Sequence, residues 1–198
     1  MEGNEGGKEN PQEMVMNFGG AAFRKDKLVG FLDRTEARGA NWVRGEVKSG
    51  VVIVPAIIDK NRRISMEIIK TWADIRPSID DGKIKFTIEV NAVGDMVENQ
   101  DAPKPMDHTE YLNYFLEVEN KFKSGIEQEV RAAADKAQDE LQSDILGFGD
   151  ALGRKYPKEW KELKDKWGEL FPQVEYDVNV IVTLERPGLI LKPFEPKE

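Results

Sequence analysis

The chain has 198 residues, 39% of them hydrophobic and 33% charged, which is typical of one globular domain or two small ones. Its 37 acidic and 29 basic residues give a formal net charge of −8, which argues against nucleic acid as a partner because lysine and arginine contacts to phosphates dominate such binding. The absence of cysteine excludes disulfides, thiolate catalysis and zinc–thiolate sites.

The two ends of the chain have the composition of tails. Residues 1–13 combine glycines, a proline and charges with almost no apolar side chain, and such a segment cannot bury enough surface to offset its ordering entropy. We therefore expect a flexible linker or tail over residues 1–13, a single α+β domain over residues 14–190 and a tail over residues 191–198. Met1 is interpreted as an artificial start within a linker, with a complete small cytosolic protein as the alternative.

The first ordered feature predicted is a β-hairpin. Two apolar-rich runs, residues 14–24 and 27–32, are joined at Lys25 and Asp26, which is the pattern of two strands and a tight turn. Glycines inside both runs indicate a bulge or a close backbone approach.

A short helix is predicted next. Asp33 and Glu36 have the spacing of a capping box, in which each side chain accepts from the backbone of the other residue. The helix should continue to Val43 and end at Gly45, a suitable residue just past a helix C-terminus.

Three further strands are expected before the middle of the chain. Residues 47–58 and 64–72 are apolar-rich, and residues 83–93 alternate apolar and polar side chains after the hairpin turn Asp81-Gly82. Because proline cannot donate to a strand ladder, the backbone around Pro77 should lie at an edge or a bulge.

The longest helical pattern follows. Asp107 and Glu110 repeat the capping-box spacing, and apolar residues then recur every three or four positions over residues 109–142. Such a helix is on the order of 50 Å long, against a diameter of roughly 42 Å for a compact chain of this length. It should overrun the domain or bend at Ser124 and Gly125, and we favour the bend.

The C-terminal third should hold two more helices and one strand. Residues 144–154 form a shorter helical piece, and Pro157 opens a last helix that ends at Pro172. Residues 174–184 then alternate, with valine, tyrosine and leucine on one face. Strands with a single apolar face indicate an antiparallel sheet covered on one side. The prediction is an α+β fold, a mostly antiparallel sheet of about six strands with a long helix and shorter helices packed on one face.

Patterns typical of catalysis or metal binding are missing. His108, the one histidine, fits a solvated position beside a helix cap, and the acidic pairs fit turns. Residues 147–149 (Gly-Phe-Gly) lack the lysine and hydroxyl of a phosphate loop and follow a helix instead of a strand. Trp160 and Trp167 have the spacing of a buried helix face, with a stacking platform as the less favoured alternative. We predict no cofactor, no metal and no enzymatic activity.

Two long blocks nevertheless resemble a known family. Residues 23–55 and 143–172 are similar to the C-terminal domain of the Ger(x)C family, the lipoprotein C subunits of nutrient germinant receptors in spore-forming bacteria. The first block supplies Phe23, Lys25, Asp26, Lys27, Leu28, Val29, Gly30, Glu36, Arg38, Gly39, Trp42, Arg44 and Gly45. The second supplies Asp144, Ile145, Gly147, Phe148, Gly149, Tyr156, Pro157, Trp160, Trp167 and Phe171, and the closing residues 186–189 resemble the family's Arg-x-Gly-Leu end.

The sequence also departs from the family pattern. Many members carry a cysteine shortly after the third strand, where this chain has Ala56 and Ile57. The lipid-bearing cysteine that the family carries near its N-terminus is absent as well, so the resemblance implies a membrane anchor only for the parent protein.

The resemblance implies a role in spore germination. The parent would be a lipoprotein on the outer face of the inner spore membrane, working with the A and B membrane subunits of a germinant receptor. Because nutrient recognition is attributed mainly to the B subunit, the C subunit would be a non-catalytic component that contributes to assembly and signalling through protein–protein contacts. The fragment itself is expected to be soluble and to meet the membrane only through a lipid anchor on the missing N-terminal region.

Two surfaces are candidates for those contacts. One is the hairpin tip, Lys25 and Asp26, and the other is the segment after the long helix, Asp144, Gly147, Phe148 and Gly149. The first alternative function is a germinant-binding domain with a pocket between sheet and helices. A hydrolytic enzyme, which needs two convergent carboxylates, is a distant third.

Overall fold

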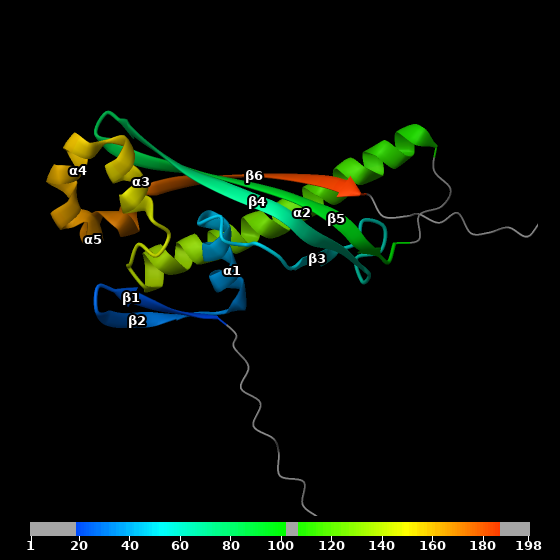
Figure 1. The fold of residues 1–198 in the computed structure, drawn as a ribbon, viewed down its shortest axis with the longest axis horizontal. Coiled ribbons are helices and arrows are strands. Elements are labelled where there is room, and N and C mark those ends of the chain that lie inside the picture. Colours follow the sequence, from blue (N-terminus) through cyan, green and yellow to red (C-terminus); the bar gives the residue numbers. More distant parts are fainter. Residues whose placement is uncertain (1–18, 102–106, 187–198) are drawn as a thin grey trace, which may run out of the picture.

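The computed structural model describes residues 19–101 and 107–186 and consists of two β-sheets with helices (Figure 1). The predicted tails, residues 1–13 and 191–198, lie outside the described residues, as does the predicted start of the first strand. In chain order the elements are β1 (Gly20–Arg24), β2 (Lys27–Leu32), α1 (Arg34–Val43), β3 (Val51–Pro55), β4 (Arg63–Asp80), β5 (Lys83–Asn99), α2 (His108–Asp135), α3 (Phe148–Lys155), α4 (Pro157–Leu163), α5 (Trp167–Leu170) and β6 (Glu175–Arg186).

The strands form a four-stranded sheet, in the order β3-β4-β5-β6, and a separate hairpin of β1 and β2. Strands β4 and β5 make a long antiparallel hairpin through Asp81 and Gly82, which both have positive φ as a type I′ turn requires. Strand β3 pairs with β4 only as far as Glu67, so Pro77 lies on an open edge, as predicted. The α+β class and the mostly antiparallel pairing are confirmed.

Two features of the sheet differ from the sequence-based expectation. The six strands divide into two sheets, and β6 runs parallel to β5. The direction of β6 follows from α2, which carries the chain back along the sheet so that β6 starts at the same end as β5 (Figure 1). A strand buried on one face shows the same alternation whichever way its neighbour runs, so the sequence pattern could not give this direction.

One face of the four-stranded sheet carries the core. The inward side chains of β5 meet the buried stripe of α2, and both sets are less than 2% exposed: Phe86, Ile88, Val90, Val118, Phe122, Ile126 and Val130. Helices α1 and α3 also contact β4. The capping boxes at Asp33 and Asp107 are both present, with reciprocal bonds to Glu36 and Glu110.

Helix α2 runs without interruption through Ser124 and Gly125, where the sequence suggested a bend. Gly125 lies against β3, and an added Cβ would come within 3.1 Å of the Val54 side chain, so the glycine there permits close packing. The helix departs from α geometry only at Lys136–Glu140, which form a π turn. At its other end, the first turns of α2 extend past the end of β6 (Figure 1).

The predicted last helix is broken into short pieces. Between α4 and α5 lies a 3-10 segment, Lys164–Lys166, and a second one, Phe171–Gln173, follows α5. The rings of Trp160 and Trp167 meet edge to face with centroids 5.4 Å apart. Seven residues along a straight helix rise about 10 Å, so the break helps to bring the two indoles together.

Candidate partner-binding surface

One residue of each predicted contact segment lines a single groove. The groove has a volume of about 600 Å³ and is bounded by the tip of the β1–β2 hairpin, the connection between α2 and α3, and the region of α5. Lys25 comes from the hairpin and Asp144 from the connection. These two parts of the chain are far apart in the sequence, since Arg24 precedes Gln142, to which it donates a hydrogen bond, by 118 positions. The described lining residues are Phe23, Arg24, Lys25, Gln142, Ser143, Asp144, Lys164, Asp165, Trp167, Gly168 and Phe171.

The hairpin is tied to the rest of the domain just below its tip. The guanidinium of Arg24 donates to the carbonyl of Leu141 at 2.9 Å and also to that of Gln142, and the Ser143 hydroxyl donates to the Phe23 carbonyl at 3.3 Å. Beyond these bonds the tip is exposed at Lys25 and Asp26, and 55% of Phe23 is accessible. The exposed ring of Phe23 and the nearby Lys25 are therefore presented from a hairpin that is held by hydrogen bonds to residues 141–143.

Asp144 holds the other wall of the groove. Its carboxylate accepts the backbone N–H groups of Gly147, Phe148 and Gly149 at 2.9, 3.0 and 2.7 Å, and the indole N–H of Trp167 at 2.9 Å. This arrangement caps the N-terminus of α3, where a negative charge is also favoured by the helix dipole. The carboxylate thus has a complete internal role in addition to lining the groove.

Phe148 and Gly149 are buried and are not among the residues that line the groove. Phe148 is 1% exposed and stacks on Phe86 with ring centroids 4.4 Å apart. A Cβ on Gly149 would lie 2.7 Å from the indole nitrogen of Trp167, so no larger residue fits there. Of the six predicted contact residues, Lys25, Asp26, Asp144 and Gly147 retain accessible surface.

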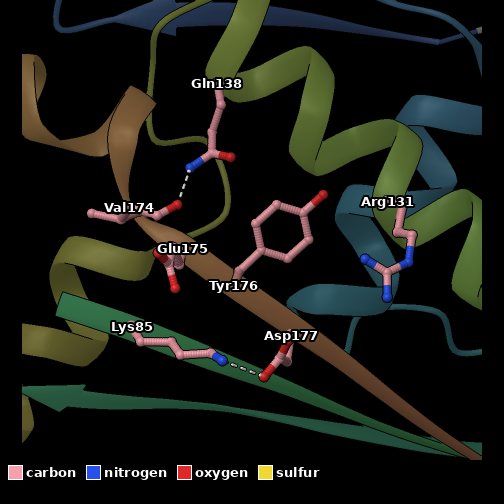
Figure 2. Close-up of a pocket in the computed structure, with 7 residues that line it drawn as sticks. All are labelled: Lys85, Arg131, Gln138, Val174, Glu175, Tyr176 and Asp177. Atoms are coloured by element: carbon pink, nitrogen blue, oxygen red, sulfur yellow. Dashed lines mark hydrogen bonds and ion pairs between the residues drawn. The ribbon is translucent and has the colours of Figure 1, made fainter. Parts of the chain in front are cut away.

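A second hollow, of about 380 Å³, lies between the C-terminal half of α2 and the start of β6 (Figure 2). This is where a pocket between sheet and helices would be expected. Several of its polar side chains, however, already have partners: Gln138 donates to the Phe171 and Val174 carbonyls, and Lys85 pairs with Asp177 at 2.8 Å. The Tyr176 hydroxyl donates to Asp135. The pKa of Tyr176 is raised, mainly because the hydroxyl is buried and secondly because of this hydrogen bond.

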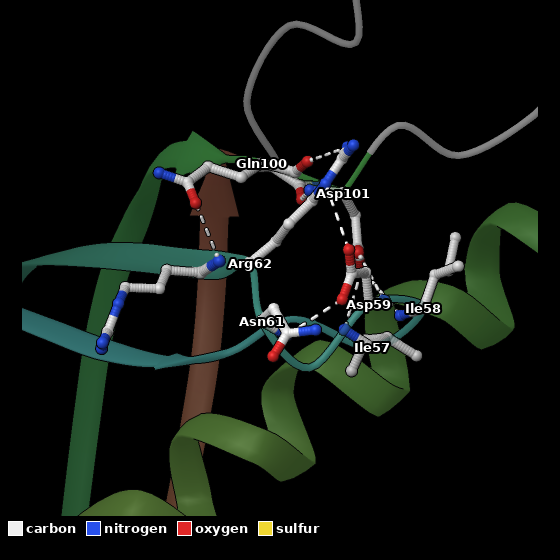
Figure 3. A network of polar contacts seen from close by, with 9 residues as sticks. Ile57, Ile58, Asp59, Asn61, Arg62, Gln100 and Asp101 are labelled. Carbon is white, nitrogen blue, oxygen red and sulfur yellow. Dashed lines mark hydrogen bonds and ion pairs between the residues drawn. The ribbon is translucent and has the colours of Figure 1, made fainter.

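Two buried carboxylates, which no sequence pattern indicated, join separate elements of the domain by hydrogen bonds. Asp101 accepts the backbone N–H groups of Ile57, Ile58 and Asp59 at 2.8, 3.1 and 3.2 Å (Figure 3). The Tyr114 hydroxyl donates to the same carboxylate at 3.2 Å, which links the β3–β4 connection to α2. The donors of this site come from another part of the chain, so no local sequence pattern marks it.

Glu129 of α2 is the second of these carboxylates and is 9% exposed. It accepts from Arg38 Nε at 2.7 Å and from the Trp42 indole N–H at 2.9 Å, which joins α1 to α2. Arg38 and Trp42 belong to the first block that resembles the Ger(x)C family. In this structure both have an internal, structural role.

The described residues carry few groups suited to chemistry. They contain no cluster of three or more histidine, cysteine, aspartate or glutamate side chains placed to hold a metal ion. His108 is the exposed first residue of α2. Of the helices that the structure describes, none has the length and the apolar content needed to cross a membrane.

The comparisons with known proteins agree on one family. A family model described as "Spore germination B3/ GerAC like, C-terminal" matches residues 18–188. Spore germination protein B3 of Bacillus subtilis (strain 168) is 31% identical over 167 residues, covering 84% of this chain and 43% of that protein. Spore germination protein KC of the same strain is 23% identical over 189 residues, covering 94% and 45%.

A solved structure is similar as well. The crystal structure of the GerBC protein superposes with a TM-score of 0.69 at 30% identity, and the match covers 81% of this chain and 48% of that one. This chain therefore spans less than half the length of the relatives it matches.

Proposed function

Since the chain belongs to the family of spore germination B3/GerAC-like C-terminal domains, we propose that it is a non-catalytic component of a spore nutrient germinant receptor. Its contribution is to receptor assembly and germination signalling through protein–protein contacts with the A and B membrane subunits. The parent protein acts on the outer face of the inner spore membrane, held by a lipid anchor outside this sequence. The names of the relatives, which are spore germination proteins, support this role.

The observation that carries the contact proposal is the groove beside the hairpin tip. It combines a half-exposed aromatic ring, Phe23, with the charged side chains of Lys25, Lys164 and Asp165. Aromatic side chains flanked by charges are typical of the centre and rim of protein interfaces. The groove's walls are anchored by Arg24 and Asp144, so a partner would meet a preformed surface and lose little affinity to ordering.

The test is co-purification of this chain with the receptor's membrane subunits in detergent, followed by affinity measurement. We expect Phe23→Ser combined with Lys25→Glu to weaken association about thirtyfold, the effect of removing one interface hot spot. Phe31→Ser is the matched control, because Phe31 is 68% exposed on the same hairpin but does not line the groove. Equal affinity of both variants for the membrane subunits would remove the groove as the contact.

A germinant pocket between sheet and helices is the second candidate, and the hollow beside Tyr176 has a suitable size. Most of its polar side chains already have partners, however, so a ligand would have to break existing bonds such as Lys85–Asp177. Calorimetric titration of amino acids and sugars into the chain should give no heat beyond dilution. Saturable heat that Arg131→Ala abolishes would favour this second function.

A further inference from the structure

An exposed apolar flank runs along the first turns of α2, far from the groove. Leu112 is 50% exposed and Leu116 is 57% exposed, and their spacing of four residues places them side by side on the helix. Tyr114 and Val118, between and after them, point into the core and are 5% and 0% exposed. The two leucines therefore form an apolar strip, here called the α2 flank, on the exposed side of the same helical turns.

The end of β6 lies against this same flank. The backbone N–H of Leu184 donates to the Glu119 carboxylate at 3.0 Å. Glu119 follows Leu116 by three residues and Leu112 by seven, and residues at these spacings share one face of a helix. Arg186, the last residue of β6, also pairs with Asp95 of β5 at 3.6 Å. The described chain thus ends beside the α2 flank, where β6 and α2 meet (Figure 1).

The sequence that continues from this point includes a short apolar run. Residues 187–198 read PGLILKPFEPKE, and the run Leu189–Leu191 begins three residues after Arg186. From Glu119 to Leu112 the helix rises about 10 Å, whereas five extended residues, from Leu184 to Leu189, span about 17 Å. The apolar run is therefore within reach of both exposed leucines.

We propose that the C-terminal segment, residues 187–198, docks on the α2 flank, with Leu189, Ile190 and Leu191 covering Leu112 and Leu116. Burying these side chains against one another removes apolar surface from water, and the hydrogen bond from Leu184 to Glu119 sets the point from which the segment departs. The contact is independent of the proposed partner groove, which lies at the other end of the molecule near the β1–β2 hairpin (Figure 1).

The chain's lack of cysteine allows a direct test by thiol labelling. In the full chain, Leu116→Cys should be alkylated about tenfold more slowly than the same variant in a chain that ends at Arg186, as expected for loss of roughly half a leucine's burial. Glu117→Cys is the matched control, because Glu117 is also exposed and is adjacent to Leu116 on the helix, but its side chain points about 100° away around the helix axis. Its alkylation rate should not depend on residues 187–198.

A paired variant tests the position of the docked segment. Leu116→Cys with Ile190→Cys should form an intramolecular disulfide on mild oxidation, at least about tenfold faster than Glu117→Cys with Ile190→Cys. Equal alkylation of Leu116→Cys in both chain lengths would overturn the proposal. So would a disulfide that forms only between two chains and scales with concentration, because it would assign the α2 flank to a second copy.

Discussion

Asp101 and Asp144 can be compared atom by atom, because each accepts three backbone N–H groups and one donor from an aromatic side chain. The backbone donors to Asp144 lie three to five residues after it in the sequence, and two of them belong to the buried residues Phe148 and Gly149. The fourth donor is the indole of Trp167. The backbone donors to Asp101 lie 42 to 44 residues before it, in the β3–β4 connection.

The difference between the two sites is in what surrounds the donors. Ile58 is 61% exposed, so water can reach the β3–β4 connection if the Asp101 carboxylate is removed. Phe148 and Gly149 are themselves buried and pack against the rings of Phe86 and Trp167, so water can approach their amides only from the groove that Asp144 lines. Similar hydrogen-bond counts should therefore correspond to different energies, because the penalty for an unsatisfied donor depends on its burial.

The largest expected effect is at Asp144. We expect Asp144→Ala to lower the free energy of unfolding by about 3 kcal/mol, since several buried donors lose their acceptor and α3 loses its N-terminal cap. Urea denaturation measures this change. Asp150→Ala, at an exposed position in the first turn of α3, is the control and should cost less than about 1 kcal/mol. If both variants have the same stability, the internal role of Asp144 is wrong.

A smaller and more local effect is expected at Asp101. Asp101→Ala should lower the free energy of unfolding by about 2 kcal/mol, because the freed amides of Ile57, Ile58 and Asp59 lie in a partly exposed connection. Hydrogen exchange should show faster exchange at those three amides, with unchanged protection at α3. Loss of protection throughout the sheet would show that the two sites are equivalent and that the comparison fails.

The contrast between these sites also marks how far the sequence could predict the structure. Local signals were sufficient for the capping boxes of Asp33 and Asp107, the turn at Asp81, and the strand alternation of β6. All of them depend on residues within a few positions of one another.

Long-range pairings could not be predicted in the same way. The acceptor role of Asp101, the contact of Glu129 with Trp42, and the groove that joins Lys25 to Asp144 each connect segments tens of residues apart. The parallel direction of β6 belongs to the same class, because it is set by the path of α2. The family resemblance pointed to both walls of the groove, but the burial of Phe148 follows only from the packing of α3 on β5.

The smallest expected effect is a pH dependence of stability that the Asp101 site has and the Asp144 site lacks. The Tyr114 hydroxyl donates to Asp101 and accepts from the Asn99 amide at 2.8 Å. Burial raises the pKa of Tyr114 to about 12, the bond from Asn99 opposes this, and the negative charge of Asp101 adds to it. The aromatic donor to Asp144 is an indole, which does not titrate.

The sign of the pH dependence follows from the raised pKa. The phenol of an unfolded chain has a pKa near 10, so between about pH 10 and pH 12 the unfolded state has released a proton that folded Tyr114 still holds. The contribution of Tyr114 to the free energy of unfolding should be constant below pH 10 and should fall as the pH rises through that window.

Tyr114→Phe should make this fall less steep, and Trp167→Phe should leave its slope unchanged. Because the pKa of Tyr176 is raised too, only the double variant Tyr114→Phe and Tyr176→Phe should remove most of the slope, as unfolding free energies measured at several pH values would show. A slope that Tyr114→Phe does not alter would mean that the pKa of Tyr114 is the same in the folded and the unfolded chain.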